Sequence, residues 1–293
     1  MPPNPPGKES GKIPCLVIIY HDFPIIKACL DFLAKNRDQL DIFVIENRSE
    51  HTETLIKPYA LELLRSHAIQ KYFLFAENIS MNAFEVVLQS GEIDLKQSEY
   101  VMVTDGDLTV EQPDWIEEQR RILQAHPDVF ACGLTLDMRN LPVKAFPEAV
   151  HWVDKGTEQS DCFLASTGLW LLLMRAEGFR KFIDFHRQHD YPRFSDTLLR
   201  KYCKRTLGQK WVRTKVAEAY HLTWDRYANL NDPYTRMKTT VGLRKLFQHH
   251  RYCSFEVHTP TGVARHFPVL KYLKGARRSL TAAVLGKMKA AAQ

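Results

Sequence analysis

The sequence predicts an α/β fold in which a mostly parallel sheet is flanked by helices. Three observations support this prediction: short apolar runs rich in β-branched residues, amphipathic segments between them, and polar residues at the end of each run. Right-handed crossovers bring the carboxyl ends of parallel strands to one edge of a sheet, so those polar residues are expected to meet there. At 293 residues, the chain is long enough to bury a sizeable core.

Strands and helices alternate through the first half of the chain. Apolar runs predict strands over residues 15–20, 41–45 and 72–76 and from Tyr100 onward. Helical spacing predicts helices over residues 25–36, 55–66 and 81–89, the last of them capped by Ser80. This alternation is typical of βαβ units and therefore favours a parallel sheet.

The second half is less regular. It predicts helices over residues 115–125, 177–186 and 195–207, with Gly208 closing the last one, and strands over residues 129–136 and 211–220. We expect a long loop over residues 141–159, and residues 162–175 combine strand-like and helix-like pieces around Gly168. Neither a G-x-G-x-x-G after the first strand nor a P-loop pattern occurs, which disfavours a dinucleotide fold and a P-loop enzyme.

The cysteine pattern and the N-terminal residues predict the cellular compartment of the protein. The six cysteines are scattered and none forms a C-x-x-C pair, so their spacing indicates neither a zinc site nor a disulfide framework. Residues 1–13 contain Pro, Gly and Lys without the apolar segment of a signal peptide, and we expect a disordered lead-in there. Reduced cysteines and the lack of a transmembrane-length run predict a cytoplasmic protein.

Positive charge is concentrated in the tail. After Glu256 there is no Asp or Glu, while seven Lys and Arg side chains exceed the whole net charge of +6. A basic patch confined to a tail does not indicate a nucleic-acid-binding core. From Phe267 onward, apolar residues alternate with basic ones, which predicts an amphipathic helix broken near Gly275. Such a helix could lie on an anionic membrane surface, giving a peripheral protein on its inner face, or pack on the preceding domain. Both alternatives remain open.

The residues Asp105-Gly106-Asp107 are the clearest candidate for a functional site in the sequence. A buried strand that ends in two carboxylates places them at the carboxyl edge of the sheet, where they repel each other unless a cation lies between them. Oxygen ligands in a polar crevice suit Mg²⁺ or Mn²⁺, usually with phosphate oxygens completing the shell. Taken alone, the same residues fit a polar turn equally well, because Asp-Gly is common in turns.

The order of these motifs resembles GT-A glycosyltransferases of the family 2 type. The features that carry the resemblance are the strand ending at Tyr20-His21, the turn over residues 46–49, the Asn-containing segment 78–82, the D-x-D motif at 105–107, the acid Asp196 opening a helix that ends in Gly208, and the strand ending in His221. The resemblance covers roughly residues 14–225. Two positions depart from the family pattern: Asn47 stands where Asp is usual, and His21 where Asn is usual. These departures concern the identity of the donor more than the reaction class.

The resemblance implies a GT-A domain over residues 14–235, followed by a helical basic extension over residues 236–293. It also implies inverting transfer of a sugar from a nucleotide-diphosphate donor to a saccharide or lipid-linked acceptor, as in surface polysaccharide synthesis, with Mn²⁺ or Mg²⁺ as cofactor. Asp105, Asp107 and His221 are the expected metal ligands. Expected contacts to the nucleotide sugar come from Tyr20, Glu46, Asn47, Asn78 and Asp105.

An inverting transfer needs a base that removes the proton from an acceptor hydroxyl, and Asp196 is the candidate, with Asp190 as its substitute. An equally good interpretation makes Ser195 or Asp196 the N-cap of a helix. Trp224 is the expected acceptor contact, since aromatic faces pack on sugar rings. Two rival functions remain open: a nucleotidyltransferase, which would also use paired acids around Mg²⁺, and a non-catalytic protein that binds a nucleotide or a glycan.

Overall fold

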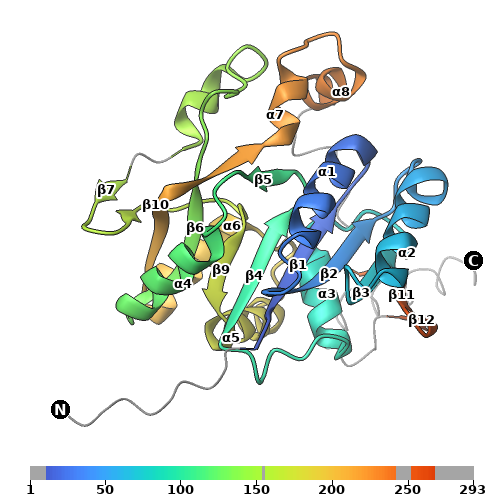
Figure 1. Ribbon diagram of the computed structural model, residues 1–293, viewed down its shortest axis with the longest axis horizontal. Helices are drawn as coiled ribbons and strands as arrows, with labels where there is room; N and C mark the ends of the chain where they lie inside the picture. The colour runs from blue at the N-terminus through green and yellow to red at the C-terminus, as the bar shows by residue number, and fades with distance from the viewer. Residues whose placement is uncertain (1–10, 154–155, 242–251, 268–293) are drawn as a thin grey trace, which may run out of the picture.

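One mixed sheet of twelve strands runs through the computed structural model, which describes residues 11–153, 156–241 and 252–267 (Figure 1). The strands are β1 Ile13–Ile19, β2 Leu40–Asn47, β3 Lys71–Phe75, β4 Tyr100–Asp105, β5 Leu108–Val110, β6 Val129–Leu136, β7 Thr157–Glu158, β8 Phe163–Leu164, β9 Leu172–Arg175, β10 Lys210–His221, β11 Phe255–Thr259 and β12 Gly262–His266. The α-helices are α1 Phe23–Ala34, α2 Lys57–Arg65, α3 Asn82–Ser90, α4 Trp115–Ala125, α5 Ala176–Gln188, α6 Asp196–Tyr202, α7 Leu222–Tyr227 and α8 Pro233–Val241. Two short π-helices are η1 Thr52–Ile56 and η3 Cys203–Leu207, and a short 3₁₀-helix is η2 Pro147–His151.

Parallel strands occupy the centre of the sheet. The strand order is β12-β11-β3-β2-β1-β4-β9-β6-β10-β8-β7, with β5 paired to β10 outside this path. Strands β3, β2, β1 and β4 are mutually parallel, β9 runs antiparallel between β4 and β6, and β10 is parallel to β6. The prediction of an α/β fold with a sheet flanked by helices is therefore confirmed, but the sheet is mixed: its parallel pairs lie mainly at the centre, and the outer pairs are antiparallel.

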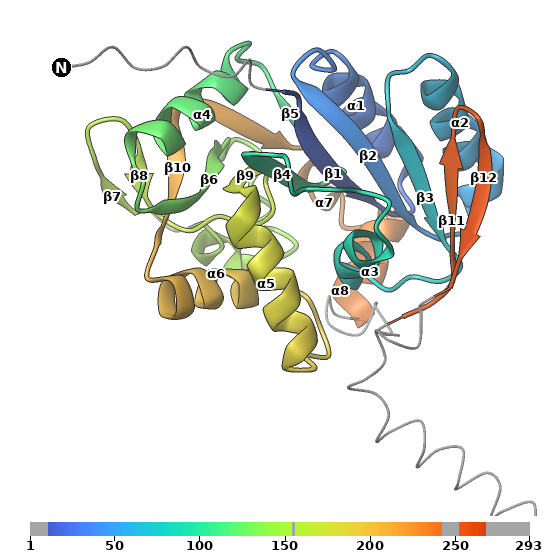
Figure 2. The same ribbon diagram turned by 90° about the horizontal axis from the view of Figure 1, so that it is seen from below.

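Helices cover both faces of the sheet, as Figure 2 shows. Along β1, Cys15, Val17 and Ile19 belong to the core shared with α1, α2 and α4, whereas Leu16 and Ile18 belong to the core shared with α3, α5 and α6. Successive side chains of a strand point to opposite faces, so a strand covered on both sides reads as a continuous apolar run. This burial explains why the central strands were recognisable from the sequence.

The boundaries of several elements match the prediction closely. Helix α4 and strand β6 have the predicted bounds. Gly208 ends η3 with a left-handed backbone, φ 66°, as its position after the helix predicted. The predicted cap at Ser80 is wrong, because α3 begins at Asn82 after Met81 and has no side-chain cap.

Two stretches differ from the prediction in kind. The expected long loop over residues 141–159 contains η2 and β7, and residues 162–175 contain β8 and β9 but no helix. The expected helical extension over residues 236–293 is wrong for its described middle part, where β11 and β12 form a hairpin that pairs with β3. Helix α8 also crosses the expected boundary at residue 235. The predicted tail helix beyond Phe267, and most of the predicted lead-in, lie outside the described residues.

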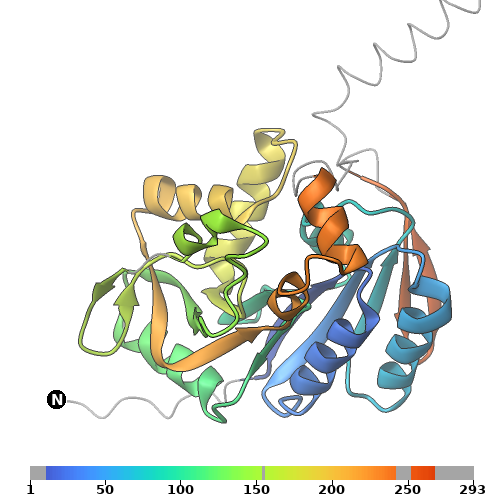
Figure 3. The same ribbon diagram turned by 90° about the horizontal axis from the view of Figure 1, so that it is seen from above.

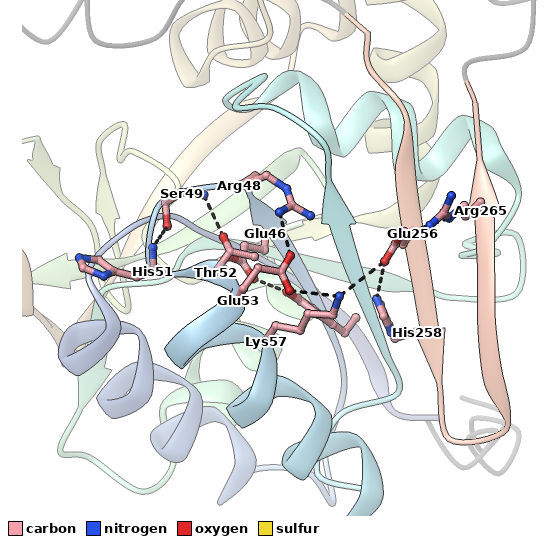
Figure 4. A network of polar contacts seen from close by, with 11 residues as sticks. Glu46, Arg48, Ser49, His51, Thr52, Glu53, Lys57, Glu256, His258 and Arg265 are labelled. Atoms are coloured by element: carbon pink, nitrogen blue, oxygen red, sulfur yellow. Dashed lines mark hydrogen bonds and ion pairs between the residues drawn. The ribbon is translucent and has the colours of Figure 1, made fainter.

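Charged side chains fasten the hairpin β11–β12 to the preceding helices (Figure 4). The Lys57 ammonium lies 3.5 Å from Glu53 and 3.8 Å from Glu256, so it links η1 to β11. Glu256 also lies 3.2 Å from His258 on the same strand. Within the described residues, no helix is long and apolar enough to cross a bilayer.

Candidate functional site

A cleft of about 530 Å³ opens at the carboxyl ends of β1, β2 and β4, beneath α7 and α8. Figure 3 shows α7 and α8 beside this end of the sheet. The predicted site residues that line the cleft are Tyr20, Asn47, Asn78, Asp105, Asp107, Asp196, His221 and Trp224. Glu46 and Asp190 are not among its lining residues. The fold therefore brings together most of the side chains that the sequence predicted to meet.

The two carboxylates of the D-x-D motif lie on a tight connection between β4 and β5. Gly106 fits there because a β-carbon at this position would lie 2.9 Å from the backbone oxygen of Ile18 and would collide with the Ile19 side chain. The backbone of the motif is thus pressed against the end of β1. Any larger residue would push Asp105 and Asp107 away from that strand.

Strand β10 delivers His221 to Asp107. The antiparallel pair β5–β10 places His221 opposite Leu108, and the Leu222 N–H donates to the Asp107 backbone oxygen at 2.8 Å. The Thr223 hydroxyl donates to Asp107 Oδ2 at 2.6 Å, and His221 Nδ1 lies 3.4 Å from the same oxygen. Two segments more than a hundred residues apart are therefore locked together at the acid pair.

The electrostatics of the acid pair favour a cation. Burial raises the pKa of Asp105 well above its usual range, and the nearby Asp107 and Asp196 raise it further while Lys238 opposes them. Among the described residues, buried Asp107 Oδ1 and His221 Nδ1 have no hydrogen-bond partner. Burial also lowers the pKa of His221, which keeps the imidazole neutral, the form that binds metals. Unpartnered carboxylate and imidazole atoms facing one cleft fit a divalent cation.

Asp196 begins α6 but does not cap it. The Ser195 hydroxyl accepts a hydrogen bond from the Leu198 N–H at 3.1 Å and fills the cap position. The Asp196 carboxylate accepts the N–H of Thr197 at 2.6 Å and lines the cleft. Ser195 is therefore the N-cap of α6, and the Asp196 carboxylate lies in the cleft as the candidate base.

Asn82 holds the loop that leads to Asp196. Its side-chain oxygen accepts the Phe194 N–H at 2.7 Å, and its amide donates to the Pro192 oxygen at 3.3 Å. Asn82 is buried on α3 and was predicted only as part of a motif segment. Asp190 lies earlier in this loop with a positive φ of 53°, outside the cleft lining. The structure therefore does not support Asp190 as a substitute base.

Glu46 and Asn47 lie on opposite faces of β2, so they do not share a role. Glu46 is fully buried and accepts hydrogen bonds from the Thr52 and Tyr72 hydroxyls, away from the cleft. A direct contact between Glu46 and a nucleotide is therefore not supported. Asn47 lines the cleft, and its side-chain oxygen accepts the Ile79 N–H at 2.9 Å. Asn47 thus fixes the loop that carries Asn78.

Aromatic side chains form one wall of the cleft. The predicted acceptor contact, Trp224, is only 3% exposed and stacks on His221 with ring centres 4.6 Å apart. That packing orients His221 and leaves little of Trp224 for a ligand. Trp152 and Trp170, which were not predicted, also line the cleft and are partly exposed. They offer more free aromatic surface than Trp224.

Lys238 is the main cleft residue that sequence reasoning missed. It belongs to α8, is 8% exposed and lies over the Tyr234 ring with its nitrogen 5.0 Å from the ring centre. Burial lowers its pKa to about 8, while Asp107 and Asp105 oppose that shift. Helix α8 is joined to α7 by the Thr235 hydroxyl, which donates to the Arg226 backbone oxygen at 2.9 Å, and the Arg226 side chain forms a two-point ion pair with Asp22 before α1. No sequence motif marks such a residue, because α8 reads as an ordinary polar helix.

Comparisons with known proteins find relatives of unassigned function. No protein-family profile matches the sequence. Uncharacterized protein L137 of Acanthamoeba polyphaga mimivirus is 45% identical over 230 residues, covering 78% of this chain and 31% of that protein. Uncharacterized protein L142 of the same virus is 42% identical over 233 residues, covering 78% of this chain and 47% of that protein. The chain therefore spans less than half the length of these relatives.

Two solved structures share part of the arrangement. GalNAc-T7, crystallised with UDP, GalNAc and Mn²⁺, superposes with a TM-score of 0.47 at 10% identity, covering 72% of this chain and 43% of that one. The 4-diphosphocytidyl-2C-methyl-D-erythritol synthase of Anaerococcus prevotii DSM 20548 gives a TM-score of 0.42 at 12% identity, covering 70% of this chain and 88% of that one. Because both scores and both identities are low, the case for a function rests on the cleft residues.

Proposed function

We propose that this chain is a metal-dependent inverting glycosyltransferase that moves a sugar from a nucleotide-diphosphate donor to a saccharide or lipid-linked acceptor. The observation that carries the proposal is the convergence of three carboxylates, Asp105, Asp107 and Asp196, on one cleft at the carboxyl edge of the parallel strands. Paired acids supply a cation site, and a third acid supplies a base. An inverting sugar transfer uses a base on the acceptor, and a cation can stabilise the departing nucleoside diphosphate.

The acid pair would hold the cation. The Thr223 hydroxyl orients Asp107 by a hydrogen bond, and His221 Nδ1 lies 3.4 Å from the Asp107 carboxylate. Asp105 precedes Gly106 in the sequence, as Asp107 follows it. A Mn²⁺ or Mg²⁺ ion bound by Asp105, Asp107 and His221 would stabilise the negative charge that develops on the departing diphosphate. Thr223 and the stacked Trp224 keep the two best-placed ligands, Asp107 and His221, in fixed orientations.

Lys238 would bind the same diphosphate from α8. An ammonium in a partly closed cleft interacts more strongly with a phosphate than it would in water, because the local dielectric is low. The negative charges of Asp105 and Asp107 attract the Lys238 ammonium. The chain thus provides one fixed positive charge next to the site proposed for the cation.

Asp196 would remove the proton from the acceptor hydroxyl. Because Ser195 caps the helix, the carboxylate does not fill the cap position. Asn82 fixes the preceding loop by two hydrogen bonds to its backbone, which limits how far Asp196 can move. Trp152 and Trp170 would pack against the apolar faces of a saccharide acceptor.

Thermal unfolding against a panel of nucleoside diphosphates, nucleoside triphosphates and nucleotide sugars, each with and without Mn²⁺, tests the donor site. A ligand at about 100 times its Kd stabilises by about 2.7 kcal/mol, which raises Tm by roughly 4–5 °C for a chain of this size. We expect a shift that requires both one nucleotide and the metal, and that Asp107→Asn abolishes. The exposed Asp38 provides the matched control, Asp38→Asn.

The products then separate the reaction classes. Release of a nucleoside diphosphate together with a glycosylated acceptor is the expected result. Release of pyrophosphate from a triphosphate would instead identify a nucleotidyltransferase. A panel without any shift in a well-folded chain would reject the donor site and favour a protein that binds a glycan without catalysis.

A further inference from the structure

Three metal-ligating side chains meet at a second place, outside the cleft. His126 follows the end of α4, and Asp161 and Cys162 lie in the turn between β7 and β8. His126 Nε2 lies 3.0 Å from both carboxylate oxygens of Asp161. The ligand atoms of all three residues lie within 4.8 Å of one another, and none of these residues lines the cleft.

The spacing of these atoms fits a small tetrahedral ion. Two ligands bound at about 2.0 Å with a tetrahedral angle lie about 3.3 Å apart, close to the 3.0 Å between His126 Nε2 and the Asp161 oxygens. The donor set, one thiolate, one imidazole and one carboxylate, combines soft and borderline ligands. Zn²⁺ binds all three types, whereas Mg²⁺ and Mn²⁺ prefer oxygen.

The surrounding backbone holds the three residues in place. Arg175 donates to the backbone oxygens of Leu123 and His126, which fixes the end of α4. The Gln159 N–H donates to the Cys162 oxygen at 2.9 Å and closes the turn that carries the other two ligands. The site would therefore need little rearrangement to bind an ion.

The contacts of the hairpin β7–β8 with the rest of the sheet are to β10. Strands β7 and β8 are two residues long, β7 forms the edge of the sheet, and both are largely exposed. Their hairpin pairs with β10 through β8, and Lys215 on β10 lies 2.6 Å from Glu158. Figure 2 shows the hairpin beside β10, with α4 nearby. An ion shared by His126 and the turn would tie this exposed hairpin to α4.

The chemistry of Cys162 is consistent with ion binding. Its side chain is buried at 2% exposure, and its sulfur lies within 4.8 Å of the ligand atoms of His126 and Asp161. Binding of Zn²⁺ would form the zinc–sulfur bond and release the thiol proton to solvent, since the thiolate is the ligand.

We propose that His126, Asp161 and Cys162 form a zinc site that fastens the hairpin β7–β8 to the end of α4. The fourth position is open to a water molecule, because the side chains of His126 and Asp161 are 34% and 33% exposed. The site is independent of the nucleotide cleft, and the proposal does not rest on the proposed transferase activity. No sequence motif indicates this site, because His126 and Asp161 are 35 residues apart and Cys162 belongs to no C-x-x-C pair.

Cobalt substitution tests the site directly. The full chain, reduced and stripped of metal with a chelator, is titrated with Co²⁺, whose thiolate complexes have a charge-transfer absorption that oxygen-only sites lack. We expect one equivalent of this band, displaced by Zn²⁺, in the unaltered chain and in Asp107→Asn. Cys162→Ser should remove the band. Cys203→Ser is the matched control, since Cys203 is equally buried but has no neighbouring His or Asp in the cluster.

A second variant separates ligation from folding. Asp161→Asn preserves the shape of the turn, and we expect it to weaken Zn²⁺ binding at least tenfold while circular dichroism stays unchanged. Limited proteolysis with and without Zn²⁺ adds a structural readout, in which cleavage within residues 156–164 should slow when the ion is bound. Absence of the charge-transfer band in the unaltered chain, or its persistence in Cys162→Ser, would overturn the proposal.

Discussion

Among the residues that the structure describes, no cationic side chain pairs with the buried Glu46 carboxylate, and this predicts a specific dependence of stability on pH. It is fully buried at the end of β2, where the Thr52 and Tyr72 hydroxyls donate to it. Burial raises its pKa to about 7, although those hydrogen bonds oppose the shift. Glu46→Gln keeps the shape and most of the hydrogen bonding of the side chain and removes its titration.

The sign of the effect follows from proton linkage. In the unfolded chain the carboxyl loses its proton near its ordinary pKa of 4.5, whereas in the folded chain it keeps the proton until about pH 7. Between these values the folded state binds more protons, so the free energy of unfolding falls as the pH rises. Applying the two pKa values to the interval from about pH 5 to about pH 8 gives a loss of about 2.5 kcal/mol from this one group.

Urea unfolding at a series of pH values measures this loss. Because other groups also titrate, the informative quantity is the difference between Glu46→Gln and the unaltered chain. That difference should move in favour of the variant by about 2.5 kcal/mol between about pH 5 and about pH 8. The exposed Glu62 supplies the control, and Glu62→Gln should follow the unaltered chain throughout. Parallel pH curves for Glu46→Gln and the unaltered chain would refute the reasoning.

Substitutions at three further residues test the cleft. Gly106→Ala should lower the free energy of unfolding by about 1–3 kcal/mol, because the added carbon would lie 2.9 Å from the Ile18 oxygen; an unchanged urea midpoint would contradict the close packing. Lys238→Met should weaken nucleotide binding by about 2 kcal/mol, roughly 30-fold in Kd, through loss of a charged contact, and Lys238→Arg should restore part of it in a calorimetric titration. Asp196→Asn should abolish transfer and leave the metal-dependent nucleotide shift intact; turnover near that of the unaltered chain would exclude Asp196 as the base.

The elements that the sequence predicted well are those whose burial is set locally. Strand β1 is apolar throughout because helices cover both of its faces, and α4 shows one apolar stripe between clear boundaries. The hairpin β11–β12 was missed although its residues alternate and Thr259 and Gly262 bound its turn. Its stability comes from pairing with β3 and from the Lys57–Glu256 contact, both with partners about 180–200 residues away. Long-range partners of this kind leave no local pattern.

The same distinction applies to the cleft. Asp105 and His221 were predictable because each ends a strand, Asp107 because it follows two residues after one, and strand ends of a parallel sheet gather at one edge. Glu46 and Asn47 were predicted to lie in a turn after the strand, whereas β2 extends to Asn47. Their side chains therefore point to opposite faces of the sheet, and only Asn47 lines the cleft. Lys238 required knowledge of where α8 lies, and no spacing in the sequence reveals that.

The charges of the cleft argue that metal and nucleotide bind together. Among the described lining residues, Asp22 is paired with Arg226, which leaves Asp105, Asp107 and Asp196 with the cations Lys238 and Arg193. Because the raised pKa of Asp105 favours its protonated form, these charges nearly balance, and a diphosphate entering alone would gain little attraction. A divalent ion would add positive charge and make the same cleft attractive to an anion. Nucleotide binding should accordingly require the metal, and Asp105→Asn should weaken the metal-dependent binding, because the substitution removes one proposed ligand of the cation. Metal-dependent nucleotide binding of unchanged affinity in Asp105→Asn would exclude Asp105 as a ligand.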